Sequence, residues 1–235
     1  MSVYRFKKAA VLGAGVMGAQ IAAHLANAGV PVVLFDLPAD GKDKNAIVNK
    51  ALANLGKLSP SPLASKALVN NIQAGNYDEH LALLADCDVI IEAIAERLDW
   101  KKSLYAKILP FVGPKAILAS NTSGLSINAL SEVLDESLHH RFCGLHFFNP
   151  PRYMHLVELI PCAKTDADVL TSLETFLVST LGKGVVYAKD TPNFIGNRIG
   201  VFSILSILHH TEKFKMGFDE VDALTGPLIG RPKSA

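Results

Sequence analysis

His146 and Glu158 are the residues of this chain whose types and surroundings most favour proton transfer. His146 lies among bulky apolar residues in the segment 144–150. Glu158 lies in the apolar run 156–160, where a buried carboxylate without a partner would be costly. A histidine partner would remove that cost, and an imidazole paired with a carboxylate can take a proton from an alcohol. Two other interpretations stay open: a hydrogen-bonded structural role for His146, and an ion pair with a lysine or an arginine for Glu158.

The glycine-rich turn at residues 13–18 is the second chemical signature. It joins the apolar run 9–12, which predicts a buried parallel strand, to the amphipathic run 16–28, which predicts a helix. In such a unit the first glycine allows a tight turn, the second lets a pyrophosphate approach the backbone, and the third lets helix and strand pack closely. The predicted cofactor-binding residues of the turn are Gly13, Ala14, Gly15, Val16, Met17 and Gly18. An ordinary turn is the alternative for a glycine pattern alone.

Asp36 ends the next apolar run, at 32–35, and indicates which dinucleotide the turn would accept. A carboxylate at this place accepts hydrogen bonds from the ribose hydroxyls of adenosine and repels a 2′-phosphate. We therefore predict NAD as the cofactor rather than NADP. A His–Glu pair beside a nicotinamide suits the oxidation of an alcohol, because the imidazole takes the hydroxyl proton while a hydride leaves the same carbon.

The order of apolar runs and helical patterns predicts an α/β fold with a Rossmann-type doubly wound, mostly parallel sheet. Further strands are expected at 88–91, 116–119, 142–148, 154–160 and 184–188, and helices at 100–109, 126–134 and 167–181. The polar, Ala- and Leu-rich stretch 41–80 is expected to be a helical insertion. Ligands of such sheets bind beyond the carboxyl ends of the strands, which is where Glu92, Glu96 and the segment 120–124 fall.

A second, all-helical region is predicted to follow, which divides the chain into an NAD-binding domain at 1–189 and an incomplete helical domain at 190–235. Thr191 is the expected N-cap and Pro192 the expected first residue of a helix that continues to about residue 212. Apolar residues surround most of that helix, so it must be buried on several sides. After a short helix at 218–224, the chain is expected to stop inside the domain. We therefore expect a fragment or a shortened form, in which a second copy or a missing partner covers the apolar helix.

Composition limits the classes of partner. The 235 residues are 49% hydrophobic, carry a formal net charge of +1 and contain no dense stripe of lysine and arginine. These values indicate a globular protein that binds small molecules, and they argue against nucleic acid or an anionic membrane as the main partner. No run has the length of a membrane span and no signal sequence is apparent, so a cytoplasmic location is expected. Cys87, Cys143 and Cys162 form no C-x-x-C pair, so we expect core thiols and assign no metal.

At these residues the chain resembles the L-3-hydroxyacyl-CoA dehydrogenase family over essentially its whole length. The shared motifs are G-A-G-V-M-G, E-A-I-x-E, S-N-T-S, G-x-H-F-F-N-P and D-T-P-N-F-I-x-N-R, in the family's order and at close to its spacings. The segment 150–156 is most similar to the larger bacterial members, in which a dehydrogenase precedes an enoyl-CoA hydratase on one chain. The resemblance implies NAD-dependent oxidation of an L-3-hydroxyacyl-CoA to a 3-oxoacyl-CoA in fatty-acid β-oxidation. It also implies a homodimer that forms through the C-terminal helices.

The resemblance implies roles for single residues as well. His146 would be the catalytic base with Glu158 as its partner, while Ser123 and Asn197 would hold the 3-oxygen of the substrate. The residues that it places along the cofactor are Glu96, Lys101, Ser123 and Asn149.

Local roles are the alternative for three of these residues. Ser123 could be a turn residue, Asn197 could bond within its own helix, and Lys101 could lie on a solvated helix face. Two other functions also stay open for the chain. One is a non-catalytic NAD-binding or assembly module whose surface is the apolar helix, and the other is a dehydrogenase of a 3-hydroxy acid without CoA.

Overall fold

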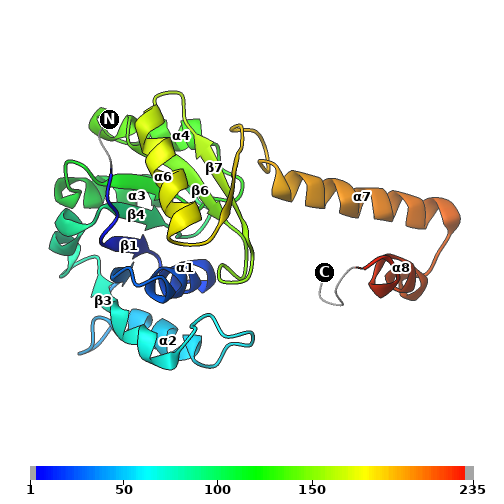
Figure 1. Cartoon of the computed structure of the whole chain (residues 1–235), viewed down its shortest axis with the longest axis horizontal. Coiled ribbons are helices and arrows are strands. Elements are labelled where there is room, and N and C mark those ends of the chain that lie inside the picture. The colour runs from blue at the N-terminus through cyan, green and yellow to red at the C-terminus, as the bar shows by residue number, and fades with distance from the viewer. Residues whose placement is uncertain (1–3, 231–235) are drawn as a thin grey trace. The chain divides into compact units, whose positions relative to one another are not determined.

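One eight-stranded sheet organises the first part of the chain in the computed structural model, which describes residues 4–230 (Figure 1). Its strands are β1 (Ala9–Leu12), β2 (Val32–Asp36), β3 (Ile72–Asn76), β4 (Val89–Glu92), β5 (Ile117–Ser120), β6 (Phe142–Phe147), β7 (Leu156–Pro161) and β8 (Gly184–Tyr187). They are ordered β3-β2-β1-β4-β5-β6-β7-β8, and all neighbours are parallel except β6 and β7. The predicted Rossmann-type, mostly parallel sheet is therefore confirmed.

The helices alternate with these strands and then follow them. They are α1 (Val16–Asn27), α2 (Ala46–Leu55), α3 (Leu98–Ile108), α4 (Ile127–Glu132), α5 (Glu136–His139), α6 (Ala167–Ser179), α7 (Gly196–Phe214) and α8 (Phe218–Thr225). The chain forms two compact units, divided between Phe194 and Ile195. The first unit holds the sheet and α1 to α6, and the second holds α7 and α8.

Alternate residues of β1 pack in two separate apolar clusters. Ala9 and Val11 belong to the cluster that includes residues of α1 and α6, whereas Ala10 and Leu12 belong to the one that includes residues of α3 and α4. All four side chains are fully buried. A strand covered on both faces is apolar at every position, which is why this short run predicted a buried strand. The glycine turn that follows therefore starts from the edge of a packed core.

The stretch 41–80 is not the helical insertion that the sequence predicted. It contains α2, but it also contains β3, which pairs in parallel with β2 at one end of the sheet. Two polar residues and Gly75 break the apolar pattern that identified the other strands. Gly75 allows close packing, because a Cβ there would lie 3.1 Å from the ring of Phe35.

The helix after the sheet begins later than predicted, because Phe194 belongs to the first unit. Phe194 is 2% exposed and has a φ of 47°, and Asn193 before it has a φ of 62°. Both conformations are left-handed, which no residue inside an α-helix adopts. The predicted N-cap at Thr191 and helical start at Pro192 are therefore wrong, and α7 begins after this turn.

The apolar side chains of α7 are not buried by the part of the chain that the structure describes. None of the 19 residues of α7 is buried, and Phe202, Ile204 and Leu205 are 73%, 60% and 60% exposed. The expected cover of this helix by a second copy or a missing partner stays a prediction. No helix in this range is long and apolar enough to cross a membrane.

Candidate active site

His146 and Glu158 face each other across the antiparallel pair β6 and β7. The two residues are directly opposite in the strand register, and the His146 Nδ1 lies 2.7 Å from the Glu158 Oε2. Their side chains are 4% and 0% exposed. The reversal of β7 is what makes this possible, because it brings two residues from separate motifs side by side on neighbouring strands.

Ser123 lies on the other side of the His146 ring, in the exposed loop after β5. Its Oγ is 3.2 Å from the His146 Nε2. A neutral imidazole that donates from Nδ1 to a carboxylate keeps its lone pair on Nε2, so this nitrogen can accept a proton from a nearby hydroxyl. The ring centroids of Phe148 and Phe194 lie 4.6 Å and 5.8 Å from that of His146, and these contacts restrict the orientation of the imidazole.

The glycine turn has the backbone shape that a dinucleotide phosphate needs. Gly13 has a φ of 104°, and a Cβ there would lie 2.7 Å from the Ala93 carbonyl oxygen. A Cβ at Gly18 would lie 1.8 Å from the Gly13 carbonyl oxygen, so the close approach of α1 requires glycine. At Gly15 a Cβ would meet nothing within 4 Å, and no side chain caps the start of α1. The amides at this helix N-terminus are therefore open to an anionic ligand.

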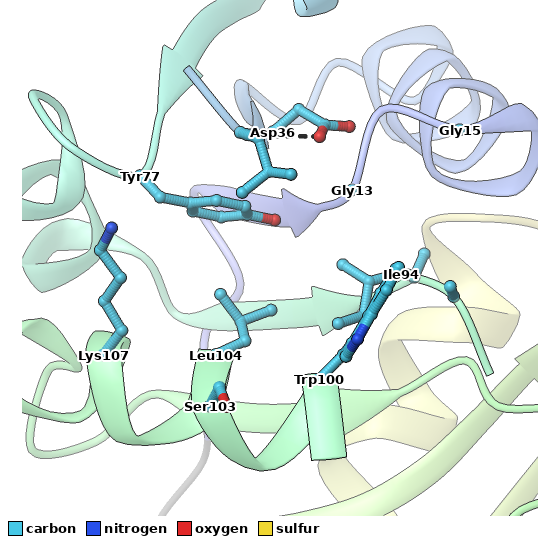
Figure 2. Close-up of a pocket in the computed structure, with 12 residues that line it drawn as sticks. Gly13, Gly15, Asp36, Tyr77, Ile94, Trp100, Ser103, Leu104 and Lys107 are labelled. Carbon is cyan, nitrogen blue, oxygen red and sulfur yellow. Dashed lines mark hydrogen bonds between the residues drawn. The ribbon is translucent and has the colours of Figure 1, made fainter. Parts of the chain in front are cut away.

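Asp36, at the end of β2, borders a cavity of about 490 Å³ that reaches Gly13 and Gly15 (Figure 2). Its Oδ2 accepts a hydrogen bond from the Ala14 amide at 2.6 Å, and its Oδ1 accepts one from the Leu37 amide at 2.7 Å. These bonds fix the carboxylate beside the glycine turn, where ribose hydroxyls of an adenosine would meet it. The residues present thus fit an adenine dinucleotide.

The sequence did not predict most of the walls of this cavity. They include Tyr77, which follows β3, and the α3 residues Trp100, Ser103, Leu104 and Lys107. The α3 positions recur at helical spacing and so lie on one face, a signal that could have identified this wall. Nothing in the sequence pointed to Tyr77, because the strand that carries it was itself missed.

Tyr77 places a buried polar group next to the cavity. The side chain is 4% exposed, and its hydroxyl lies beside the Gly13 backbone without a hydrogen bond of ordinary geometry. Burial, with the nearby negative charges of Asp36 and Glu92, raises the pKa of Tyr77 well above its ordinary value. The hydroxyl therefore keeps its proton and can donate a hydrogen bond to a bound ligand.

Comparison with known proteins identifies the family. A family model described as "3-hydroxyacyl-CoA dehydrogenase, NAD binding domain" matches residues 8–191. The chain belongs to the 3-hydroxyacyl-CoA dehydrogenase family. Over 98% of its length it is 46% identical to the "Probable 3-hydroxyacyl-CoA dehydrogenase" of Deinococcus radiodurans, of which it covers 67%. The resemblance to the family, the class of NAD-dependent oxidoreductases and the cofactor NAD are thereby confirmed.

Other relatives of this 3-hydroxyacyl-CoA dehydrogenase family member differ in length. A "Probable 3-hydroxyacyl-CoA dehydrogenase" of Bacillus subtilis is 43% identical over 97% of this chain, which spans 31% of the Bacillus protein. Among solved structures, the (S)-3-hydroxybutyryl-CoA dehydrogenase of Ralstonia eutropha is 30% identical with a TM-score of 0.81. That match covers 97% of this chain and 79% of the Ralstonia chain.

In this family member, Glu96 and Lys101 belong to a chain of polar contacts beside Ser123. The Glu96 Oε1 accepts from the Thr122 hydroxyl at 2.6 Å and from the amides of Ser123 and Gly124 at 2.5 Å and 3.1 Å. The Glu96 Oε2 lies 3.5 Å from the Lys101 Nζ, and the lysine side chain is 0% exposed. The alternative of a solvated helix face for Lys101 is therefore wrong. The cofactor contacts predicted for both residues stay predictions.

Asn149 and Asn197 lie in different units of the chain. Asn149 is exposed after β6, and its Oδ1 accepts a hydrogen bond from the buried Gln20 side chain of α1 at 3.2 Å. That bond ties the end of the His146 strand to the helix after the glycine turn. Asn197 lies in the first turn of α7, in the second unit. Its predicted contact with the substrate stays a prediction.

The three cysteines of the chain are free and buried, as the sequence predicted. Burial raises the pKa of Cys87 to about 11, so its thiol keeps its proton at neutral pH. Within residues 4–230 no group of three or more His, Cys, Asp and Glu side chains is arranged to hold a metal ion.

Proposed function

We propose that this chain interconverts L-3-hydroxyacyl-CoA and 3-oxoacyl-CoA with NAD, as a step of fatty-acid β-oxidation. The observation that carries the proposal is the line of three side chains through His146. Its Nδ1 is 2.7 Å from Glu158 and its Nε2 is 3.2 Å from Ser123, and Ser123 is exposed while the other two are buried. A proton acceptor is thus held by a buried carboxylate and directed to an accessible hydroxyl.

In the oxidation direction, the substrate's 3-hydroxyl would give its proton to the His146 Nε2. The electron pair of the O–H bond forms the new carbonyl as the hydride leaves C3, and bound NAD supplies the acceptor for that hydride. Glu158 stabilises the imidazolium through Nδ1, and in the reverse direction His146 returns the proton. Ser123, with Asn197 as the resemblance implies, would donate hydrogen bonds to the 3-oxygen and favour the charge that develops there.

We propose the cofactor-binding residues that the glycine turn, Asp36 and the family resemblance predict. The turn from Gly13 to Gly18 would hold the pyrophosphate and Asp36 the adenosine ribose, while Glu96, Lys101, Ser123 and Asn149 would line the nicotinamide half. The open space at Gly15 and the fixed carboxylate of Asp36 support this assignment.

The direct test is the oxidation of NADH in the presence of acetoacetyl-CoA, followed by absorbance, with NADPH run beside it. Turnover that prefers NADH is expected. Binding of NADH without turnover would contradict the proposal and favour a non-catalytic cofactor or assembly module. Free CoA should compete with acetoacetyl-CoA, and a lack of competition would indicate a 3-hydroxy acid dehydrogenase that does not recognise CoA.

We also propose that the C-terminal helices pair two copies of the chain. Ile199 and Phe202 on α7 and Phe218 on α8 are 63%, 73% and 75% exposed, and apolar surface of this extent is typical of an interface. Light scattering should give the mass of two chains, and that of one chain for an Ile199→Ser/Phe202→Ser variant. The mass of a single chain without substitutions would contradict the pairing.

We further propose that the enzyme acts in the cytoplasm with an acyl-CoA as its small-molecule partner. The three free thiols are in keeping with a reducing compartment. Fractionation of cells that express the protein tests the location, and recovery outside the cytoplasm would contradict it.

A further inference from the structure

A second carboxylate, Glu92, is hydrogen-bonded to Ser120, just before the loop that carries Ser123. It takes no part in the proposed proton transfer. It ends β4 and is 0% exposed. Its Oε1 accepts from the Lys101 Nζ at 2.6 Å and from the Ile94 amide at 2.8 Å. Its Oε2 accepts from the hydroxyls of Tyr105 and Ser120 at 2.9 Å and 2.6 Å. These four donors replace the hydrogen bonds that the carboxylate would make to water, which offsets the cost of burying it.

Tyr105 is a donor to Glu92 and not a second acid. Burial, followed by the charge of Glu92, raises the pKa of Tyr105 well above its ordinary value. The phenol thus keeps its proton and holds the Glu92 Oε2 from the α3 side.

Lys101 lies between this buried carboxylate and Glu96, which in turn is bonded to the loop that carries Ser123. Its Nζ lies between two carboxylates, 2.6 Å from Glu92 and 3.5 Å from Glu96. The nearer partner is fully buried, whereas Glu96 is 43% exposed. Glu92 is therefore the main counter-charge of the lysine. The Glu96 Oε1 can then accept hydrogen bonds from the amides of Ser123 and Gly124.

The same two carboxylates hold the S-N-T-S motif along its length. Ser120 donates to Glu92, and the Thr122 hydroxyl and the Ser123 amide donate to Glu96. The two motifs E-A-I-x-E and S-N-T-S, which are far apart in the chain, are thus one interlocked structure in space.

We propose that Glu92 is a positioning residue for the Ser123 hydroxyl. Glu92 neutralises Lys101, and Glu96 therefore stays bonded to the loop amides, which hold Ser123 beside His146. This role rests on the proposed function for its effect on catalysis. Without the charge of Glu92, the buried ammonium has Glu96 as its remaining carboxylate partner, and the attraction draws the Glu96 Oε2 inward. The Oε1 then moves away from the amides of Ser123 and Gly124, and the loop loses its anchor.

The test compares Glu92→Gln with a matched control, Glu174→Gln. Glu174 also accepts from a tyrosine hydroxyl, that of Tyr187 at 2.8 Å, but it lies on α6, and no hydrogen bond or ion pair among the described residues joins it to the proposed site. In Glu92→Gln we expect faster hydrogen exchange at the Ser123 and Gly124 amides, and no change there in Glu174→Gln. This readout does not depend on turnover, so it tests the link even if acetoacetyl-CoA is not reduced.

The kinetic arm separates positioning from folding. A displaced Ser123 should lower kcat by about 10- to 100-fold, while KM for acetoacetyl-CoA and Kd for NADH change by less than about 3-fold. Tyr105→Phe, which keeps the charge and removes one donor to Glu92, should lower kcat by about 3-fold. It is the second variant to measure if Glu92→Gln does not fold. Unchanged amide exchange in the folded variants, or a lower melting temperature with normal kcat, would overturn the proposal.

Discussion

The cofactor end and the catalytic end of the site are built from different kinds of interaction. At the cofactor end, backbone shape dominates: Gly13, Gly15 and Asp36 come from one continuous β1–α1–β2 unit, and the key contact is a backbone amide on a carboxylate. At the catalytic end, His146 and Ser123 come from separate elements and are held by side-chain hydrogen bonds. Because the two ends are built differently, we expect one set of substitutions to change Kd for the dinucleotide and another set to change kcat.

The largest expected effect separates the two ends most clearly. His146→Ala removes the proton acceptor, so kcat for the reduction of acetoacetyl-CoA should fall by about 1000-fold. Its Kd for NADH, measured by fluorescence titration, should stay near that of the unaltered chain. His140→Ala, an exposed histidine, is the control and should change neither value. A parallel collapse of NADH binding in His146→Ala would show that the two ends are not separable.

Gly15→Ala makes the converse change at the cofactor end. The added Cβ meets nothing within 4 Å in the protein, so the melting temperature should hold. It occupies the space through which a phosphate approaches the amides, and the loss of one charge-assisted hydrogen bond should raise Kd for NADH by about 10-fold. Gly56→Ala is the control: the residue after α2 has a φ of −70°, and a Cβ there would make only an ordinary contact, 3.8 Å from the Ala53 carbonyl oxygen. An unchanged Kd in Gly15→Ala would contradict the proposed phosphate position.

The smallest effect on the site itself comes from the scaffold that both ends share. His24 on α1 bonds the Leu181 carbonyl through Nε2, and burial, with Lys183 nearby, lowers its pKa from 6.5 to about 4. Protonation thus favours the unfolded chain, and stability is lost as pH falls through this window. The contribution is on the order of 3 kcal/mol.

Melting temperatures measured from pH 7 to pH 4 test this effect. The unaltered chain should lose stability more steeply than His24→Gln, which keeps a donor for Leu181 and does not titrate. NADH binding should weaken together with stability, because α1 carries the phosphate-binding amides. Equal slopes for the two proteins would contradict the assignment of His24 as a neutral buried residue.

How much the sequence could predict follows the same division. The strand, turn and helix around Gly13–Gly18 are local patterns, and the structure gives them within a residue or so of the predicted bounds. The cost of burying the Glu158 carboxylate suggested that it pairs with His146. The sequence did not determine the strand register that places the two residues opposite each other. The Glu92 cluster could not be predicted, because it depends on four side chains meeting in the interior.

Two errors have physical causes of the same kind. The strand β3 lies at one end of the sheet with polar residues and a glycine, so its sequence lacks the apolar run of a strand buried on both faces. Phe194 fits a helical apolar pattern, but the first unit buries it beside His146 and turns the chain there. Contacts with residues far away in the sequence determine both the strand β3 and the turn at Phe194. Local sequence patterns carry no information about such contacts.

The most direct test of the account is the fate of deuterium from NADH deuterated at both C4 positions. The chain is mixed with this NADH and acetoacetyl-CoA, and the 3-hydroxyacyl-CoA product is analysed by mass spectrometry beside a His146→Ala sample. The account predicts a product that carries deuterium at C3, formed by the unaltered chain and nearly absent with the variant. Unlabelled product, or no product from a chain that binds NADH normally, would contradict direct hydride transfer at this site.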